Sequence, residues 1–259
     1  MSDRRKRAKD AIVLLHGFMG SGGDWSEVIS CLGASDRVLI PDLPGHGRAT
    51  GLIPPAYTMD GAADGLIRLL DRQQIQRASF VGYSMGGRLA LHAALRHPDR
   101  VRQLVLISAS PGLESESERE ARRKLDARRA EAIQADLPSF LENWYQMPLF
   151  STLDDRTRQQ LVGQRSGNVP VELVKSLRGM GTGVQPSHWE QLHMIDVPAC
   201  AIAGAHDPKF VSIARRMAET SSFRARIMPD VGHAILAENP QDLAVLLQEL
   251  LSIRQQSSN

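Results

Sequence analysis

The stretch 82–86, Gly-Tyr-Ser-Met-Gly, constrains the fold of this chain more than any other part of the sequence. It follows a short apolar run, 78–81, and precedes an alanine- and leucine-rich segment, 86–96, whose pattern predicts a helix. Glycine on both sides of a serine is typical of a sharp turn from a strand into a helix, because a side chain at either glycine would clash. The hydroxyl of Ser84 would then project above the end of a sheet. We therefore predict a reactive serine; the alternative is a tight glycine turn that happens to contain one.

Six short apolar or β-branched runs, each followed by turn-forming residues, predict strands that are buried on both faces. These runs are 11–15, 38–40, 78–81, 104–107, 200–203 and 225–228. Helical patterns lie between them, at 59–73, 86–96 and 243–251. Strands that alternate with helices imply right-handed crossovers and a mostly parallel central sheet flanked by helices. The sequence therefore predicts an α/β fold that binds ligands at the carboxyl ends of its strands.

One segment, residues 114–192, interrupts this alternation because it contains no strand-like run. It begins with a highly charged helical pattern at 114–134 and continues with further helical stretches. We interpret it as an inserted helical cap that covers the strand ends. The core then consists of 11–113 and 193–259, and the basic residues of 1–10 are expected to form a solvated tail. A length of 259 residues fits one structural domain.

The overall composition argues against several classes of function. A formal net charge of +2 is far below what a nucleic-acid-binding surface needs, so no nucleic-acid partner is expected. No apolar stretch reaches the roughly 18 residues of a membrane span and no signal peptide is evident, so we expect a cytoplasmic protein. Cys31 and Cys200 have neither C-x-x-C spacing nor histidine neighbours, so buried free thiols are expected rather than a disulfide or a metal site.

Two further residues follow predicted strands and are expected to form a Ser-His-Asp triad with Ser84. A serine hydroxyl is weakly reactive until a histidine takes its proton and a carboxylate orients that histidine. Asp207 follows the run 200–203 and His233 follows the run 225–228, which gives the order serine, acid, histidine of the α/β-hydrolase fold. The other histidines of helices, cap and acid loop are expected to be surface or packing residues: His92, His97, His188, His193 and His206.

The first predicted strand ends at His16-Gly-Phe18, on the same edge of the sheet as Ser84. We expect the backbone amide of Phe18 to form half of an oxyanion hole and the amide of Met85 to form the other half. The alternative is a simple turn at the end of a strand. Because base, acid and electrostatic stabiliser all come from side chains and amides, no metal and no organic cofactor are expected.

Motifs along nearly the whole chain from Ile12 resemble those of one family. The sequence is similar to the 2-succinyl-6-hydroxy-2,4-cyclohexadiene-1-carboxylate synthases of menaquinone biosynthesis, within the α/β-hydrolase superfamily. The early motifs are shared by the whole superfamily, whereas those of the predicted cap are more specific. The motifs are His16-Gly-Phe18, Asp42-Leu-Pro-Gly-His-Gly47, Gly82-Tyr-Ser-Met-Gly-Gly-Arg88, Ser110-Pro-Gly-Leu113, Asn143-Trp-Tyr-Gln146, Gln164-Arg-Ser166, Val184-Gln-Pro186, Asp207-Pro-Lys-Phe210 and Gly232-His233.

The resemblance implies a lyase rather than a hydrolase. Enzymes of that family eliminate pyruvate from an enolpyruvyl-cyclohexene tricarboxylate by abstracting a ring proton and expelling the enolpyruvyl group. Ser84, activated by His233 and Asp207, would then act as a base and not as an acylated nucleophile. The amides of Phe18 and Met85 would stabilise charge that is delocalised onto a carbonyl oxygen.

Arginines provide a separate argument for an anionic substrate. Arg88 lies one helical turn beyond Ser84, where an esterase with a neutral substrate has little use for a guanidinium. The resemblance adds Arg122 and Arg165 as substrate-binding residues. Arg122 has an alternative role on a solvated helix face, paired with a residue such as Glu118, and Arg119 and Arg123 crowd the same helix.

Two aromatic residues, Tyr83 and Trp144, are expected to form walls around the substrate ring, and Tyr83 can also hydrogen-bond a carboxylate. Trp144 has an alternative role as a core residue that fastens the cap. The sequence departs from the family in the histidine loop, where Gly232-His-Ala-Ile-Leu236 has apolar residues at positions that are often polar. This departure leaves room for a different substrate.

Two other functions remain open at this stage. One is a serine carboxylesterase or carbon–carbon bond hydrolase that uses Ser84 as a nucleophile. The other is a non-enzymatic ligand receptor with the same fold. A pocket in which Arg88 and Arg165 both approach Ser84 favours the polyanionic substrate, whereas an apolar tunnel favours the esterase.

Overall fold

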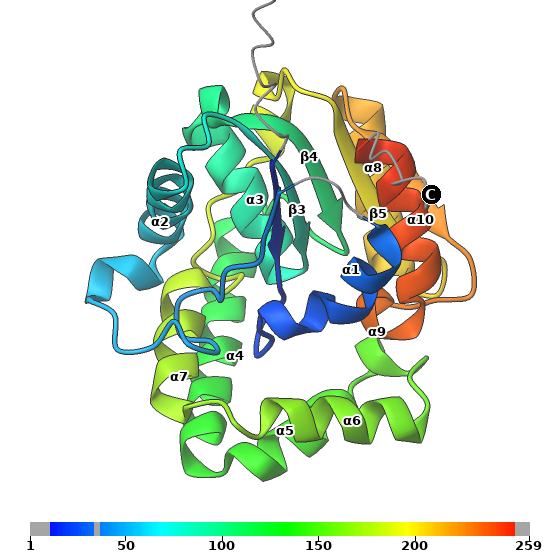
Figure 1. Ribbon diagram of the computed structural model, residues 1–259. Helices are drawn as coiled ribbons and strands as arrows, with labels where there is room; N and C mark the ends of the chain where they lie inside the picture. The colour runs from blue at the N-terminus through cyan, green and yellow to red at the C-terminus, as the bar shows by residue number, and fades with distance from the viewer. Residues whose placement is uncertain (1–10, 34–36, 252–259) are drawn as a thin grey trace, which may run out of the picture.

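The computed structural model describes residues 11–33 and 37–251, and within them six strands form one parallel sheet (Figure 1). The strand order is β2-β1-β3-β4-β5-β6. All six predicted strands are present. β4 begins three residues before its apolar run, because residues 101–103, Val-Arg-Gln, belong to the strand but include two polar side chains. The strands are β1 (Ala11–Leu15), β2 (Arg37–Leu39), β3 (Ala78–Tyr83), β4 (Val101–Ile107), β5 (Ala199–Gly204) and β6 (Arg224–Met228).

Helices cover both faces of the sheet and bury separate apolar cores. Side chains of β1 alternate between the two: Val13 packs into the core beneath α2, α3 and α8, whereas Ile12 packs into the core beneath α1 and α10. The core that contains Val13 also holds Leu66 of α2 and Leu89 of α3. The helices are α1 (Ser26–Leu32), α2 (Met59–Arg72), α3 (Met85–Arg96), α8 (Pro208–Thr220), α9 (Ile235–Glu238) and α10 (Pro240–Leu251).

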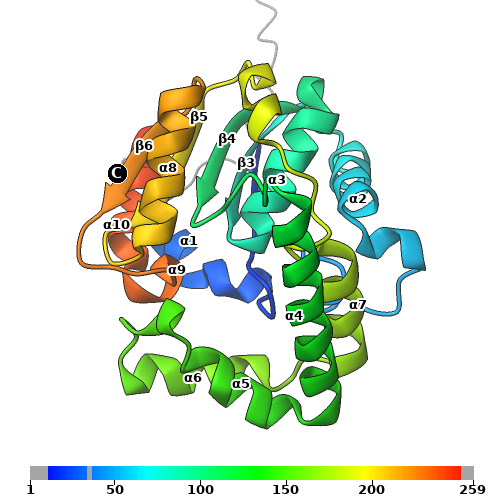
Figure 2. The same ribbon diagram turned by 180° about the vertical axis from the view of Figure 1, so that it is seen from behind.

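Four further helices lie between β4 and β5 in the sequence and cross the carboxyl ends of the strands (Figures 1 and 2). The first of these helices begins after a capping box, in which the side chain of Ser115 accepts a hydrogen bond from the amide of Glu118 and the side chain of Glu118 accepts one from the amide of Ser115. The helix therefore starts two residues later than the charged pattern. They are α4 (Glu116–Ala135), α5 (Leu137–Tyr145), α6 (Asp155–Arg165) and α7 (Pro170–Met180), together called the helical layer here. The exact division into core and cap stays a prediction.

Short 3₁₀ helices complete the connections between these elements. They are η1 (Gly22–Trp25), η2 (Pro54–Tyr57), η3 (Pro98–Arg100), η4 (Pro148–Phe150) and η5 (Trp189–Met194).

The structure confirms the prediction for one cysteine and contradicts it for the other. Cys200 is a buried free thiol on β5, but Cys31 is exposed, because its side chain lies on the outer face of α1. The predicted basic tail, 1–10, lies outside the described residues. No helix in 11–33 or 37–251 is long and apolar enough to cross a membrane.

Candidate active site

The turn that carries Ser84 is fixed by glycines, as the sequence predicts. Ser84 has a positive φ of 51°, which non-glycine residues seldom adopt outside constrained sites. A Cβ on Gly82 would lie 2.3 Å from the carbonyl oxygen of Gly86, and a Cβ on Gly86 would lie 2.4 Å from that of Leu15. The close approach of β3, α3 and β1 therefore requires glycine at both positions and holds Ser84 at the start of α3.

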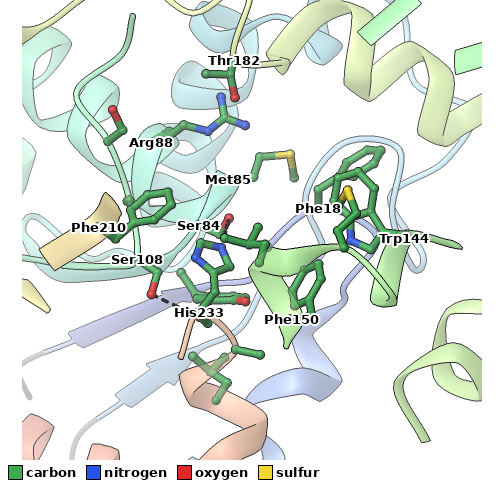
Figure 3. Close-up of a pocket in the computed structure, with 18 of the residues that line it drawn as sticks. Phe18, Ser84, Met85, Arg88, Ser108, Trp144, Phe150, Thr182, Phe210 and His233 are labelled. Carbon is green, nitrogen blue, oxygen red and sulfur yellow. Dashed lines mark hydrogen bonds between the residues drawn. The ribbon is translucent and has the colours of Figure 1, made fainter. Parts of the chain in front are cut away.

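Ser84, His233 and Asp207 meet at the carboxyl end of the sheet (Figure 3 shows the first two). Asp207 Oδ2 lies 2.8 Å from His233 Nδ1, and both side chains are about 95% buried. His233 Nε2 lies 3.4 Å from Ser84 Oγ, a long hydrogen bond of the kind found in ligand-free sites. With Nδ1–H donated to the carboxylate, Nε2 is free to accept the serine proton. This arrangement can activate the hydroxyl either as a base or as a nucleophile.

The loop of the predicted oxyanion hole is held by a buried neutral histidine. His16 donates from Nδ1 to the carbonyl of Gly17 and accepts at Nε2 from the amide of Leu43. Burial lowers the pKa of His16 to about 4, so it is uncharged at neutral pH. Phe18 and Met85 both line the cavity above Ser84, and Met85 is the first residue of α3, whose amide has no acceptor within the helix. Both residues therefore border the cavity of the serine, and the oxyanion hole formed by their amides stays a prediction.

A cavity of about 1100 Å³ extends from Ser84 to the helical layer. Its walls come from the strand ends on one side and from α4, α5 and α6 on the other. Arg88, Arg122 and Arg165 all line it, so the structure brings the three predicted arginines into one pocket with Ser84. The pocket is not the apolar tunnel that the esterase alternative called for.

Arg88 is a partly buried guanidinium without a carboxylate ion-pair partner among the described residues. Its Nη1 donates to the carbonyl of Met180 (2.8 Å) and to Oε1 of Gln185 (3.0 Å), and Figure 3 shows it reaching over Ser84 toward Thr182. Burial, with Arg122 nearby, lowers the pKa of Arg88 to about 10, which leaves it charged at neutral pH. Gln185 is itself fully buried and fixes Arg88 from the loop after α7. The sequence did not predict that Gln185 orients Arg88, although the motif Val184-Gln-Pro186 was among those that carry the family resemblance.

Arg122 projects from α4 into the cavity, so it is not on a solvated face. Its carboxylate partner is Asp126, at 2.8 Å, and not the expected Glu118. Arg119 and Arg123 do not line the cavity: both pair with Glu116 at the start of α4. Of the crowded arginines on this helix, Arg122 and a residue that the sequence reasoning missed, Arg129, face the pocket.

Arg165 lines the cavity but is already paired. Both of its terminal nitrogens donate to Asp24, each at 2.7 Å, and both side chains are more than 90% buried. Its Nε is buried and has no partner in the described part of the chain. The pairing cancels much of the positive charge that the sequence reasoning assigned to Arg165, and nothing in the local sequence around Gln164-Arg-Ser166 pointed to Asp24, 141 residues away.

The two predicted aromatic residues also line the cavity. The ring of Tyr83 lies 5.7 Å from that of His233, and burial raises the pKa of Tyr83 well above its usual value, so its hydroxyl stays a neutral donor. Trp144 packs against Phe18 and Phe150, at 5.9 and 6.2 Å between ring centroids (Figure 3). Trp144 therefore forms part of the cavity wall and also packs α5 against its neighbours, so the two roles expected for it, wall residue and core residue, are both present.

The remaining histidines lie away from Ser84. His92 and His188 are buried and form a chain in which His92 bonds Asp60 at 2.7 Å and His188 at 3.0 Å. His97 pairs with Asp64, and His193 and His206 are exposed. These residues tie α2, α3 and η5 together or face solvent.

Comparison with known proteins agrees with this fold and site. A family described as the alpha/beta hydrolase fold matches residues 10–240. A Bacillus subtilis protein, named provisionally as a 2-succinyl-6-hydroxy-2,4-cyclohexadiene-1-carboxylate synthase, is 36% identical over 97% of this chain and 94% of its own length. The Salmonella typhimurium protein with that name is 34% identical over 94% of both chains.

Among solved structures, MenH from S. aureus superposes with a TM-score of 0.88 and 31% identity, covering 96% of this chain and 95% of its own. A thermophilic esterase from Thermogutta terrifontis superposes with a TM-score of 0.80 at 25% identity, over 94% of this chain and 89% of its own. The chain therefore belongs to the α/β-hydrolase family and, within it, to the group of 2-succinyl-6-hydroxy-2,4-cyclohexadiene-1-carboxylate synthases.

Proposed function

We propose that this protein is a carbon–oxygen lyase of menaquinone biosynthesis. It eliminates pyruvate from 2-succinyl-5-enolpyruvyl-6-hydroxy-3-cyclohexene-1-carboxylate and forms 2-succinyl-6-hydroxy-2,4-cyclohexadiene-1-carboxylate. The two relatives described above, which match 97% and 94% of the chain, are named for the synthesis of this product. Its substrate is a small tricarboxylate.

One structural observation supports this function independently of the names of the relatives. The cavity that contains Ser84 also contains the partly buried guanidinium of Arg88, which has no carboxylate ion-pair partner among the described residues. Burial of a cation is unfavourable unless an anion compensates for it. A substrate carboxylate supplies that anion, whereas the neutral ester of a carboxylesterase does not.

In the proposed reaction, Ser84 Oγ removes a proton from the substrate ring while His233 Nε2 takes the serine proton. Asp207 accepts the Nδ1–H of His233 and stabilises the imidazolium that results. The electron pair of the broken C–H bond at C2 forms a double bond to C3, and the existing C3–C4 double bond moves to C4–C5. The C–O bond at C5 then breaks, and its electron pair leaves with the enolpyruvyl oxygen. The enolpyruvate that leaves takes up one proton on its methylene carbon and becomes pyruvate, and the proton held by His233 balances this uptake, so that the imidazole is neutral again. No covalent bond to Ser84 forms at any stage.

The other predicted residues have supporting roles in this proposal. The amides of Phe18 and Met85 stabilise negative charge that spreads onto a carbonyl oxygen during proton removal. Arg88, Arg122 and Arg165 bind carboxylates, and their charge-assisted hydrogen bonds orient the ring over Ser84. Tyr83 and Trp144 form apolar walls around the ring, and Tyr83 adds a neutral donor.

The test supplies the enolpyruvyl tricarboxylate to purified protein and follows pyruvate release with a coupled dehydrogenase. We expect rapid release by the wild type and almost none by Ser84→Ala. A simple aryl ester serves as the control substrate. Rapid turnover of the ester without pyruvate release would establish the carboxylesterase alternative, and no turnover of either would favour a receptor.

A further inference from the structure

Three charged residues occupy one face of α4, at spacings of four and three residues. Arg122 Nε lies 2.8 Å from Asp126 Oδ1, and Arg129 Nη1 lies 3.3 Å from the same oxygen. The Asp126 side chain is 8% exposed, and those of Arg122 and Arg129 are 26% and 18% exposed. Two partly buried guanidiniums therefore share one carboxylate oxygen at the wall of the cavity.

The charges at this wall do not balance. Asp126 offers one negative charge to two arginines, and its second oxygen, Oδ2, is buried without a hydrogen-bond partner in residues 11–33 and 37–251. Arg88, from α3, adds a third guanidinium to the lining of the same cavity. Burial is the main cause that lowers the pKa of Arg88 and of Arg129, and repulsion from Arg122 adds to it, while Asp126 opposes it. An anion that enters between them relieves this repulsion.

Arg129 is held in place by contacts that leave its hydrogen-bonding capacity largely unused. Its guanidinium carbon lies 4.9 Å from the ring centroid of Trp144, a cation–π contact. Within the part of the chain that the structure describes, the hydrogen-bond partner of its Nη2 is the sulfur of Met147, at 3.8 Å, and a thioether is a weak acceptor. A carboxylate is a far stronger partner for the same N–H group.

We propose that Arg129 is a further substrate-binding residue, and that it forms with Arg122 a two-arginine subsite for one carboxylate of the substrate. Asp126 is the positioning residue of this subsite, because it anchors both guanidiniums on the pocket side of α4. The proposal deepens the proposed function and rests on it for the identity of the substrate. It also explains why Trp144 lies beside an arginine.

The neighbouring arginine on the same helix supplies a matched control. Arg128 is exposed and does not line the cavity. Arg128→Gln and Arg129→Gln remove the same charge from adjacent positions, so a difference between them reports position and not net charge.

The first measurement is the steady-state kinetics of pyruvate release by these two variants. We expect Arg129→Gln to raise KM about ten- to a hundredfold, the effect of one lost hydrogen bond to a charged group, with a smaller change in kcat. Arg128→Gln should leave both constants within about twofold of the wild type. Arg129→Lys, which keeps the charge but not the planar fork, should give an intermediate KM and replaces Arg129→Gln if that variant does not fold. An Arg129 variant that is folded and has the wild-type KM overturns the proposal.

The second measurement uses citrate as a probe and separates this inference from the proposed function. Citrate binding is followed by the rise in the unfolding temperature of each protein. We expect Arg129→Gln to bind citrate at least about tenfold more weakly than Arg128→Gln. If the wild type releases no pyruvate, the proposed function is wrong and this measurement alone decides the inference: equal citrate affinity of the two variants overturns it, and weaker binding by Arg129→Gln supports it.

Discussion

The two walls of the pocket differ in what fixes their side chains. On the sheet side, Ser84 is held by backbone: glycines permit the close approach of β3, α3 and β1. On the side of the helical layer, Arg122, Arg129 and Arg165 are held by other side chains, through Asp126 and Asp24. A wall fixed by backbone suits groups that must keep one geometry throughout a reaction. A wall fixed by ion pairs suits the recognition of a charged substrate, because a carboxylate can join or replace those pairs.

The largest effect that this comparison predicts is on the sheet side. Ser84→Ala should lower kcat for pyruvate release by about 10⁴- to 10⁶-fold, because His233 and Asp207 act by activating the Ser84 hydroxyl and have no function in the reaction without it. The KM should change little, since the arginines that bind the substrate are untouched. A large rise in KM with kcat preserved would mean that Ser84 binds the substrate and does not react with it.

The next prediction concerns backbone packing in the two regions. In Gly86→Ala the added Cβ lies 2.4 and 2.6 Å from the carbonyl oxygens of Leu15 and His16, so we expect a loss of unfolding free energy of about 1–3 kcal/mol or more, with loss of activity. Chemical denaturation followed by circular dichroism measures the change.

The matched control lies in the helical layer. Gly163 is in α6, and a Cβ there meets nothing within 4 Å. Gly163→Ala should therefore stabilise the protein by up to about 1 kcal/mol, as alanine does in an exposed helix. If Gly86→Ala were equally well tolerated, the sheet side would not depend on backbone packing in the way described.

A smaller effect is expected from the arginine that bridges the two walls. Arg88 is on α3 but is oriented by Met180 and Gln185 from the end of the helical layer. Arg88→Met keeps much of the apolar volume and removes the charge, so kcat/KM for pyruvate release should fall about ten- to a hundredfold. Circular dichroism and the unfolding temperature should stay close to the wild type. Unfolding of this variant would assign Arg88 a structural role instead.

The last prediction is a pH dependence of stability on the sheet side, which is absent at neutral pH. Because the folded-state pKa of His16 is about 4, below its value of about 6.5 in an unfolded chain, the unfolded state binds more protons between these pH values. The stability contribution of neutral His16 is therefore complete above pH 6.5 and is lost as pH falls toward 4, by up to about 1.4 kcal/mol per pH unit.

Urea denaturation from pH 4 to pH 8 tests this dependence. His16→Gln cannot titrate in this range, so its unfolding free energy should fall less steeply with decreasing pH than that of the wild type. His46, whose pKa burial lowers to about 3, keeps part of the slope in both proteins. Parallel curves for the two proteins would show that His16 is not the titrating group.

The same contrast explains what the sequence predicted well. Local patterns predict the strands, because each strand is a short apolar run. They also predict where Ser84, Asp207 and His233 lie, because each of these residues follows such a run. The carboxyl ends of parallel strands meet at one edge, so the contacts among these residues were predictable without knowledge of the packing.

The helical layer was predicted less well because its contacts join distant or crowded charges. Arg165 meets Asp24, and no periodicity connects them. The signal for Arg129 was present: it lies seven residues after Arg122 and three after Asp126, on one face of a helix. It was obscured by Arg119, Arg123 and Arg128, which share the same charge. The exposure of Cys31 also depended on how α1 packs.

The central claim is that Ser84 removes a proton from the substrate ring and does not attack the substrate. The most direct test uses the enolpyruvyl tricarboxylate labelled with deuterium at the ring carbon that loses the proton. The account predicts that each pyruvate released is matched by one deuterium lost from the ring, and that Ser84→Ala produces neither. Turnover by the wild type that leaves the deuterium on the ring would contradict it.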